Sequence, residues 1–114
     1  MNDRELLELA AKAIGIQIEC IEDEDGLGCA RKTGGEPAWV AWSPLTDDGD
    51  ALRLAVKLRL DLMPDGHSQE ASTRNYSICV EEPNGDDPCG ALRRAITRAA
   101  AEIERARITT EDGK

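Results

Sequence analysis

Residues 42–56 read WSPLTDDGDALRLAV, and they join the end of an apolar strand to the start of an acidic helix. Thr46 or Asp47 is placed to cap this helix, because a side-chain oxygen there accepts from the free N–H groups of the first turn. Helical spacing then predicts a core-facing stripe of Ala51, Leu52, Ala55 and Val56. We expect the helix to end near Leu58, so the stretch predicts a strand–loop–helix unit in the middle of the chain.

A further helix is predicted on each side of this unit. The first covers 3–14, where Asn2 and Glu5 have the spacing of a reciprocal N-terminal cap. The second covers 88–106 and begins at Asp87-Pro88, a capping acid before a proline in the first helical position. Its apolar stripe consists of Leu92, Ala95, Ile96, Ala99, Ala100 and Ile103.

The other apolar residues alternate with polar ones, which is typical of half-buried strands. The alternation predicts strands at 16–20, 27–32, 38–42, 58–63 and 76–81. Residues 38–42 are apolar on both faces, so we expect that strand to be the most enclosed. The polar residues 67–74 are expected to form an exposed loop or a frayed edge.

These elements predict an α+β fold, with a small antiparallel sheet of four to five strands packed by three helices in the order α-β-β-(β)-α-β-β-α. The alternative is a three-layer α/β/α sandwich. A chain of 114 residues can bury one core, so we expect a single domain over 1–108 and a disordered tail over 109–114. The core must be aliphatic, because the chain has no Phe, one Tyr and two Trp.

The net charge of the chain indicates which classes of partner it can bind. The net charge is −9, which argues against direct binding of nucleic acid or of anionic membranes, because both are themselves anionic. The charge is typical of a well-solvated surface, or of a protein that presents acids to the basic groove of another protein. No secretory signal and no membrane-spanning apolar run is visible, so we expect a cytoplasmic location.

No residue pattern predicts catalysis, a cofactor or a metal. The cysteines lack the close Cys-x2-Cys pair of structural zinc sites, and in the cytosol we expect reduced thiols at all four: Cys20, Cys29, Cys79 and Cys89. Cys20 and Cys79 fall on strands and are expected to behave as small buried hydrophobes. The acids at 47–50 suit a helix start better than a calcium loop, and His67 lies in a polar stretch. The sequence predicts a protein that is not an enzyme.

Trp39 and Trp42 lie three positions apart in one predicted strand, so they point to opposite faces. Either the following helix covers Trp42 and buries it, or Trp42 is an aromatic anchor on a binding surface, as in many protein interfaces. Acidic residues at the helix start lie beside it in the sequence. The candidate partner-binding surface therefore consists of Trp42, Asp47, Asp48 and Asp50.

Three segments of the chain resemble short hypothetical proteins encoded by phages and prophages. They are ELLELAAKAIGI at 5–16, PLTDDGDALRLAVKL at 44–58 and DPCGALRRAITRAAAEI at 87–103. The layout of elements is also similar to the phage ABA sandwich domain. The resemblance implies a phage or prophage origin in a bacterium, and it transfers no activity to any residue.

Together these observations favour a non-enzymatic phage accessory protein that binds another protein, of the host or of the phage, in the host bacterial cytoplasm. In its sharper form the hypothesis is an acidic inhibitor of a nucleic-acid-binding host or defence protein. The alternative is a structural homo-oligomeric domain without a separate partner, in which the arginines of the last helix pair with acidic segments of a neighbouring copy.

Overall fold

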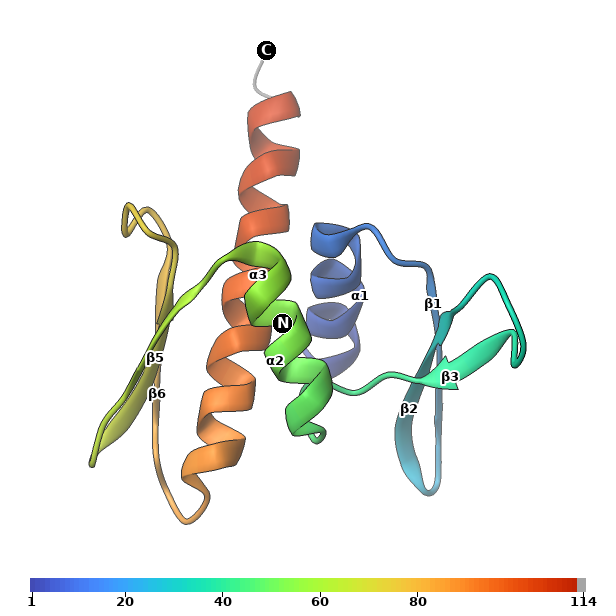
Figure 1. Cartoon of the computed structure of the whole chain (residues 1–114), viewed down its shortest axis with the longest axis horizontal. Helices are drawn as coiled ribbons and strands as arrows, with labels where there is room; N and C mark the ends of the chain where they lie inside the picture. The colour runs from blue at the N-terminus through green and yellow to red at the C-terminus, as the bar shows by residue number, and fades with distance from the viewer. Residues whose placement is uncertain (113–114) are drawn as a thin grey trace.

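The computed structural model describes residues 1–112, which form three helices and six strands (Figure 1). In chain order these are α1 (Asp3–Ile14), β1 (Ile18–Asp23), β2 (Gly26–Lys32), β3 (Trp39–Ala41), α2 (Asp48–Leu58), β4 (Asp61–Pro64), β5 (Ser68–Ser72), β6 (Cys79–Pro83) and α3 (Pro88–Asp112). The α+β class and the three helices are confirmed. The order is α-β-β-β-α-β-β-β-α, with one strand more than the prediction allowed.

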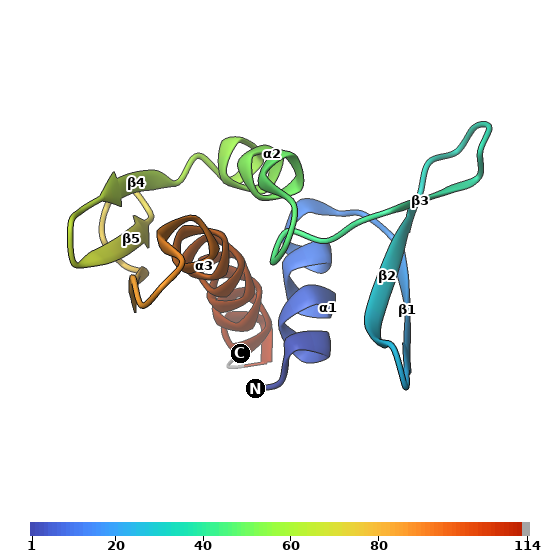
Figure 2. The same cartoon turned by 90° about the horizontal axis from the view of Figure 1, so that it is seen from below.

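The strands form two antiparallel sheets of three, in the orders β1-β2-β3 and β4-β5-β6, and not the single sheet that was predicted. The helices lie between the two sheets (Figures 1 and 2). The layers are therefore sheet–helices–sheet, and the alternative of an α/β/α sandwich is wrong. The strands are divided into two sheets because of the middle of the chain. There α2 packs on α1 and α3, so that β4, which follows α2, lies on the side of α3 away from the first sheet.

The helix starts follow the capping residues that the sequence predicted. Asn2 Oδ1 accepts a hydrogen bond from the Glu5 N–H at 2.8 Å, and Glu5 Oε1 in turn accepts one from the Asn2 N–H. Asp47, the second of the two proposed caps, accepts from the N–H of Asp50 at 2.8 Å. Asp87 does the same for Gly90 at 3.0 Å. Each carboxylate or amide oxygen accepts from an N–H of the first helical turn, which has no carbonyl partner within the helix.

Apart from Trp42 the core is aliphatic, and it centres on α3. One face of α3 packs on α1 and α2, and another packs on β5 and β6. This close packing is possible because small residues dominate the buried face of α3: Ala95, Ala99, Ala100 and Ala101. Ile96 is buried with them, whereas Leu92 and Ile103 are only half-buried.

Helix α2 is rotated relative to the prediction. Its buried residues are Asp50, Ala51, Leu54 and Ala55, whereas Leu52 and Val56 are exposed. The reason is the Asp50 carboxylate, which accepts from the Ser43 N–H and from Arg53 Nη2, both at 2.9 Å. Those two bonds offset the cost of burying a charge, so Asp50 occupies the inner face and Leu52 is turned outward.

Three further expectations need correction. The strand at 38–42 was expected to be the most enclosed, but β3 is a short edge strand that pairs only with β2. The polar stretch 67–74 was expected to be an exposed loop or a frayed edge, but it contains β5, the central strand of the second sheet. The tail was expected to begin at 109, but α3 continues through Asp112, and residues 113–114 lie outside the described residues.

Strand β5 contains a buried hydroxyl that leads to a test of stability. Ser72 is fully buried, and within residues 1–112 its Oγ has no hydrogen-bond partner. A buried polar group without a partner is destabilising by about 1–3 kcal/mol. We expect Ser72→Ala to leave the free energy of unfolding in urea unchanged or to raise it.

The control for this variant is Ser68→Ala in the same strand. The Ser68 hydroxyl donates to Glu81 Oε2 at 2.6 Å, so its removal should lower stability or leave it unchanged. A loss of more than about 1 kcal/mol in Ser72→Ala would show that its hydroxyl has a partner after all.

Candidate functional site

The four residues predicted as a partner-binding surface do not form one exposed surface. The side chain of Trp42 is 3% exposed and packs in the core, so the structure follows the interpretation in which α2 covers it. Asp50 is buried as described above. Asp47 and Asp48 are exposed, but Asp47 caps α2 and Asp48 pairs with Arg93 Nη1 of α3 at 2.6 Å. These acids hold the fold together at the start of α2.

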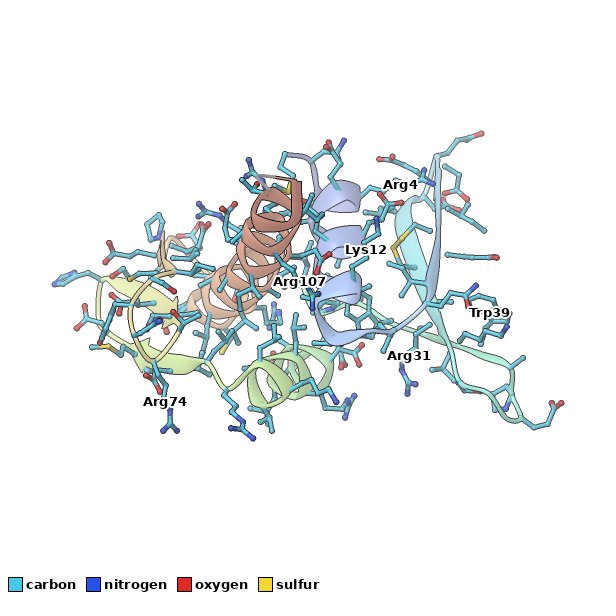
Figure 3. The ribbon with its side chains drawn as sticks, turned by 90° about the horizontal axis from the view of Figure 1, so that it is seen from above. Arg4, Lys12, Arg31, Trp39, Arg74 and Arg107 are labelled. Carbon is cyan, nitrogen blue, oxygen red and sulfur yellow. A yellow bond between two sulfur atoms is a disulfide. The ribbon has the colours of Figure 1, made fainter. Side chains whose placement is uncertain are left out.

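The other tryptophan, Trp39, occupies the sheet β1-β2-β3 on the face turned away from α1. Alternate residues of this sheet point inward, and Ile18, Leu27 and Cys29 pack against the core. Residues between them point outward, among them Ile21, whose side chain is 70% exposed. Trp39 is half-buried in β3 on this outer face, and Figure 3 shows it on the side of the sheet away from the helices.

The outer face contains a hollow of about 560 Å³ between Ile21 and Trp39. We call it the outer hollow. Its floor is low because the outward positions of β2 and β3 carry small residues: Gly26, Gly28, Ala30 and Ala41. A side chain built on Gly28 would meet no atom within 4 Å, so the missing side chain is not required by internal packing. Glycine inside a strand often marks a place where another group approaches closely.

Acidic side chains surround the outer hollow. Glu19, Asp23 and Asp25 line it, and no basic residue does. In the described part of the chain no ion pair involves any of these three carboxylates, and Asp23 Oδ1 accepts only from the N–H of Asp25. Tryptophan faces attract cations and apolar groups together. The hollow therefore offers apolar area, an aromatic ring and unpaired negative charge to the same ligand.

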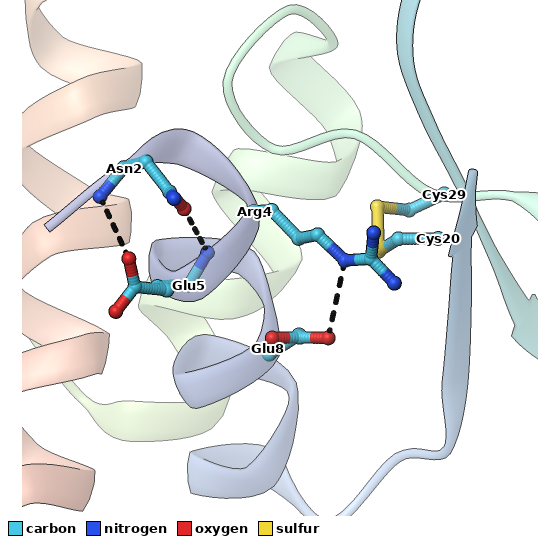
Figure 4. The surroundings of a disulfide bond; sticks show 6 residues. All are labelled: Asn2, Arg4, Glu5, Glu8, Cys20 and Cys29. Atoms are coloured by element: carbon cyan, nitrogen blue, oxygen red, sulfur yellow. Dashed lines mark hydrogen bonds and ion pairs between the residues drawn. A yellow bond between two sulfur atoms is a disulfide. The ribbon is translucent and has the colours of Figure 1, made fainter. Parts of the chain in front are cut away.

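A tight hairpin holds the outer hollow in place. Glu24 and Asp25 form the turn between β1 and β2, and Gly26 follows with φ +113°, a conformation that favours glycine. A disulfide joins Cys20 to Cys29, which are direct partners across the two strands. Figure 4 shows it between the sheet and α1, near Arg4.

The disulfide corrects the expectation of four reduced thiols. The spacing of the cysteines gave no signal for it, because the pairing depends on strand register and not on a sequence motif. Cys79 and Cys89 are free, and both are exposed, so the expectation that Cys79 is buried is also wrong.

Cys79 is a poor nucleophile in this environment. Desolvation raises the pKa of its thiol, and the carboxylates of Glu70 and Glu81 raise it further. At neutral pH the thiolate fraction of Cys79 is therefore lower in the folded protein than in an unfolded chain, and thiolate is the reactive form. We expect iodoacetamide to modify Cys79 more slowly in native protein than in urea, with a difference that shrinks as the pH rises.

The measurement uses Cys89→Ser, so that Cys79 is the one free thiol. Glu70→Gln in that background should speed the native reaction, because Glu70 is the carboxylate that raises the pKa of the Cys79 thiol more. Faster modification of Cys79 in the native state than in urea would contradict the direction of this shift.

The remaining sequence candidates give no second site. His67 is exposed in the turn between β4 and β5. Among the side chains that the structure describes, those of residues 1–109, no three of His, Cys, Asp or Glu are placed to share a metal ion. None of the described helices is long and apolar enough to cross a membrane. Comparisons of this chain with family models, with curated proteins and with solved structures found no match.

Proposed function

We propose that this protein is a non-enzymatic binding module that takes up a basic segment of another protein in the outer hollow. The observation that supports the proposal is the combination of Trp39, a floor of small residues and unpaired acids on one face of a sheet. An arginine or lysine side chain matches this combination, because its aliphatic stem packs on apolar surface while its charged end reaches carboxylates. Neighbouring apolar side chains of the segment would contact Ile21.

The biological setting proposed from the sequence is that of a phage or prophage accessory protein in the host bacterial cytoplasm. An acidic module that binds basic segments would inhibit a nucleic-acid-binding host or defence protein by occupying its phosphate contacts. The Cys20–Cys29 disulfide is the observation that favours an oxidising compartment instead. Quantifying free thiols in rapidly quenched cells would separate the two settings.

The structure gives less support to the homo-oligomeric alternative. That alternative needs α3 arginines that are available to a neighbouring copy. Within the chain, however, the α3 arginines already pair with Asp48, Asp87, Asp3, Glu82, Glu102 and Glu104. A partner with its own basic segment is the simpler proposal, because the unpaired charge of the outer hollow is negative.

The test is a titration with two synthetic peptides, one that alternates arginine with leucine and one in which glutamate replaces arginine. We expect only the arginine peptide to bind, with an affinity that falls as salt is raised, because exposed charges are screened. The double variant Glu19→Gln, Asp23→Asn should weaken binding about tenfold or more. Trp39 fluorescence or calorimetry would report the affinity.

The matched control is Glu81→Gln, Asp86→Asn, which removes the same amount of charge from the other side of the molecule. We expect this control to bind the arginine peptide within about twofold of the unmodified protein, because distant exposed charges are screened. Equal losses in both double variants would show that net charge, and not the outer hollow, determines binding. Equal binding of the two peptides would contradict the proposal itself.

A further inference from the structure

A second hollow, on the side of the first sheet that faces α2, has the opposite charge. It has a volume of about 340 Å³ and is lined from four parts of the chain: Ile14, Ile16, Arg31, Trp42, Asp50, Arg53, Leu54 and Lys57. We call it the cationic pocket. Figure 3 shows Arg31 extending from the sheet on the side of α2, whereas Trp39 lies on the outer side.

The base of the cationic pocket is apolar. Trp42 and Leu54 are almost completely buried, and Ile14 and Ile16 pack against the same core. Ile14 and Ile16 therefore supply the apolar surface that a ligand can reach, and the buried Trp42 and Leu54 support them from the core. An apolar wall with a few convergent polar groups is the usual composition of a small-molecule site, and the volume is at the lower end of the range for such sites.

The charged groups around this wall are mostly positive. Arg31, Arg53 and Lys57 contribute three cations, and Asp50 contributes one carboxylate. The carboxylate is already engaged, because it accepts from the Ser43 N–H and from Arg53. Among residues 1–112, no hydrogen bond or ion pair engages the side chain of Arg31 or of Lys57.

This arrangement is unusual for the chain. The net charge is −9, and most of the other arginines pair with acids. Asp50 is the counter-charge of Arg53, so Arg31 and Lys57 are the two cations of the pocket without one, and repulsion among the cations is larger beside an apolar wall than in open water. An anion placed among Arg31, Arg53 and Lys57 would relieve it.

We propose that the cationic pocket binds a small organic anion with a flat apolar body and one carboxylate or phosphate group. The apolar body would pack on the half-buried Ile14 and Ile16, beside the edge of the Trp42 indole. The anionic group would accept charge-assisted hydrogen bonds from Arg31, whose planar guanidinium can pair with two oxygens of a carboxylate or phosphate, and would lie near Lys57. This site is independent of the outer hollow and of the proposed binding of a basic segment.

The experiment is an NMR titration of ¹⁵N-labelled protein with benzoate and with phenyl phosphate. We expect saturable shifts of the Trp42 indole signal and of the Arg31 side chain, with the Trp39 indole unchanged. Benzamide, which has the same ring without the charge, should bind at least about tenfold more weakly, because it offers no anionic acceptor. Comparing the two anions shows whether the pocket prefers a carboxylate or a phosphate.

Two variants test the cations of the pocket, and a third variant, at the neighbouring residue Lys32, is the control. Arg31→Met retains an apolar stem and should weaken binding about tenfold, and the exposed Lys57→Met should weaken it in the same direction. Lys32→Met removes the same charge one residue further along β2, on the opposite face of the sheet, and should leave the affinity within about twofold, because the position points away from the pocket.

The proposal is overturned if neither anion gives saturable shifts at Trp42, if benzamide binds as well as benzoate, or if Lys32→Met weakens binding as much as Arg31→Met. Lys57→Met guards against a misfolded Arg31 variant, because Lys57 is exposed in the free protein.

Discussion

Ile96→Ala should lower the free energy of unfolding by about 2–5 kcal/mol. This is a large share of the total free energy of unfolding of such a domain, which is typically about 5–15 kcal/mol. Ile96 lies in α3 at the centre of the core, with only 3% of its surface exposed. The buried alanines Ala95, Ala99 and Ala100 lie beside it on α3, and their short side chains cannot move to fill the cavity. Urea melts followed by circular dichroism would measure the loss.

The matched control is Arg94→Ala, two residues earlier in the same helix. Arg94 is partly exposed and pairs with Asp3 Oδ1 at 3.1 Å, and exposed ion pairs of this kind contribute no more than about 1 kcal/mol. Its unfolding curve should stay close to that of the unmodified protein. Equal small effects of the two substitutions would mean that α3 does not pack as described.

Trp42→Ala should have an effect of similar size, about 3–5 kcal/mol, because its indole is enclosed by α2 and the core. Trp39→Ala should cost much less, at most about 1–2 kcal/mol, since the ring is half-buried on an outer face. The comparison separates the two tryptophans, which the sequence could assign to opposite faces but not to core or surface. Thermal melts of both variants would measure it.

The opposite order of effects, with Trp39→Ala the more destabilising, would mean that the first sheet packs on the core through the face that carries Trp39. In that case the outer hollow would be part of the interior. Its acids would then be buried without partners, which is energetically unfavourable.

The sequence predicted the helices well because their signals are local. The caps at Asn2, Asp47 and Asp87 act within one helical turn, and α2 ends at Leu58 as expected. The rotation of α2 was missed because the burial of Asp50 depends on the Ser43 N–H, a partner seven residues away whose position only the folded loop defines.

The second sheet was mispredicted because β5 lacks the apolar alternation that marks a strand. Its buried positions include Gln69, Ala71 and Ser72. The Gln69 amide is satisfied by the Asp65 carbonyl at 3.0 Å and by Asn84 Oδ1 at 2.8 Å. These partners come from the turn before β5 and from the turn after β6, so a polar residue becomes a core residue only after the turns have formed.

The candidate site was only partly visible in the sequence. The prediction considered Trp39 and Trp42 together and placed the binding surface at Trp42, whereas the exposed hollow lies at Trp39. A signal for it exists in β2, where Gly26, Gly28 and Ala30 recur with a period of two. One face of that strand is therefore bare, but nothing in the sequence shows whether this face is covered by a helix.

Filling the outer hollow with a larger side chain shows whether a basic segment binds there. Gly28→Leu would add a side chain between Ile21 and Trp39, at a position where a Cβ atom meets no other atom within 4 Å. Gly35→Leu, in the loop before β3, adds the same side chain in open space outside the hollow. The measurement is the affinity of both variants for the alternating arginine–leucine peptide, with melts to verify folding. We expect Gly28→Leu to lose at least about tenfold in affinity, because the added side chain occupies the space that the ligand needs, while Gly35→Leu binds like the unmodified protein. Unchanged binding by a folded Gly28→Leu variant would contradict the account.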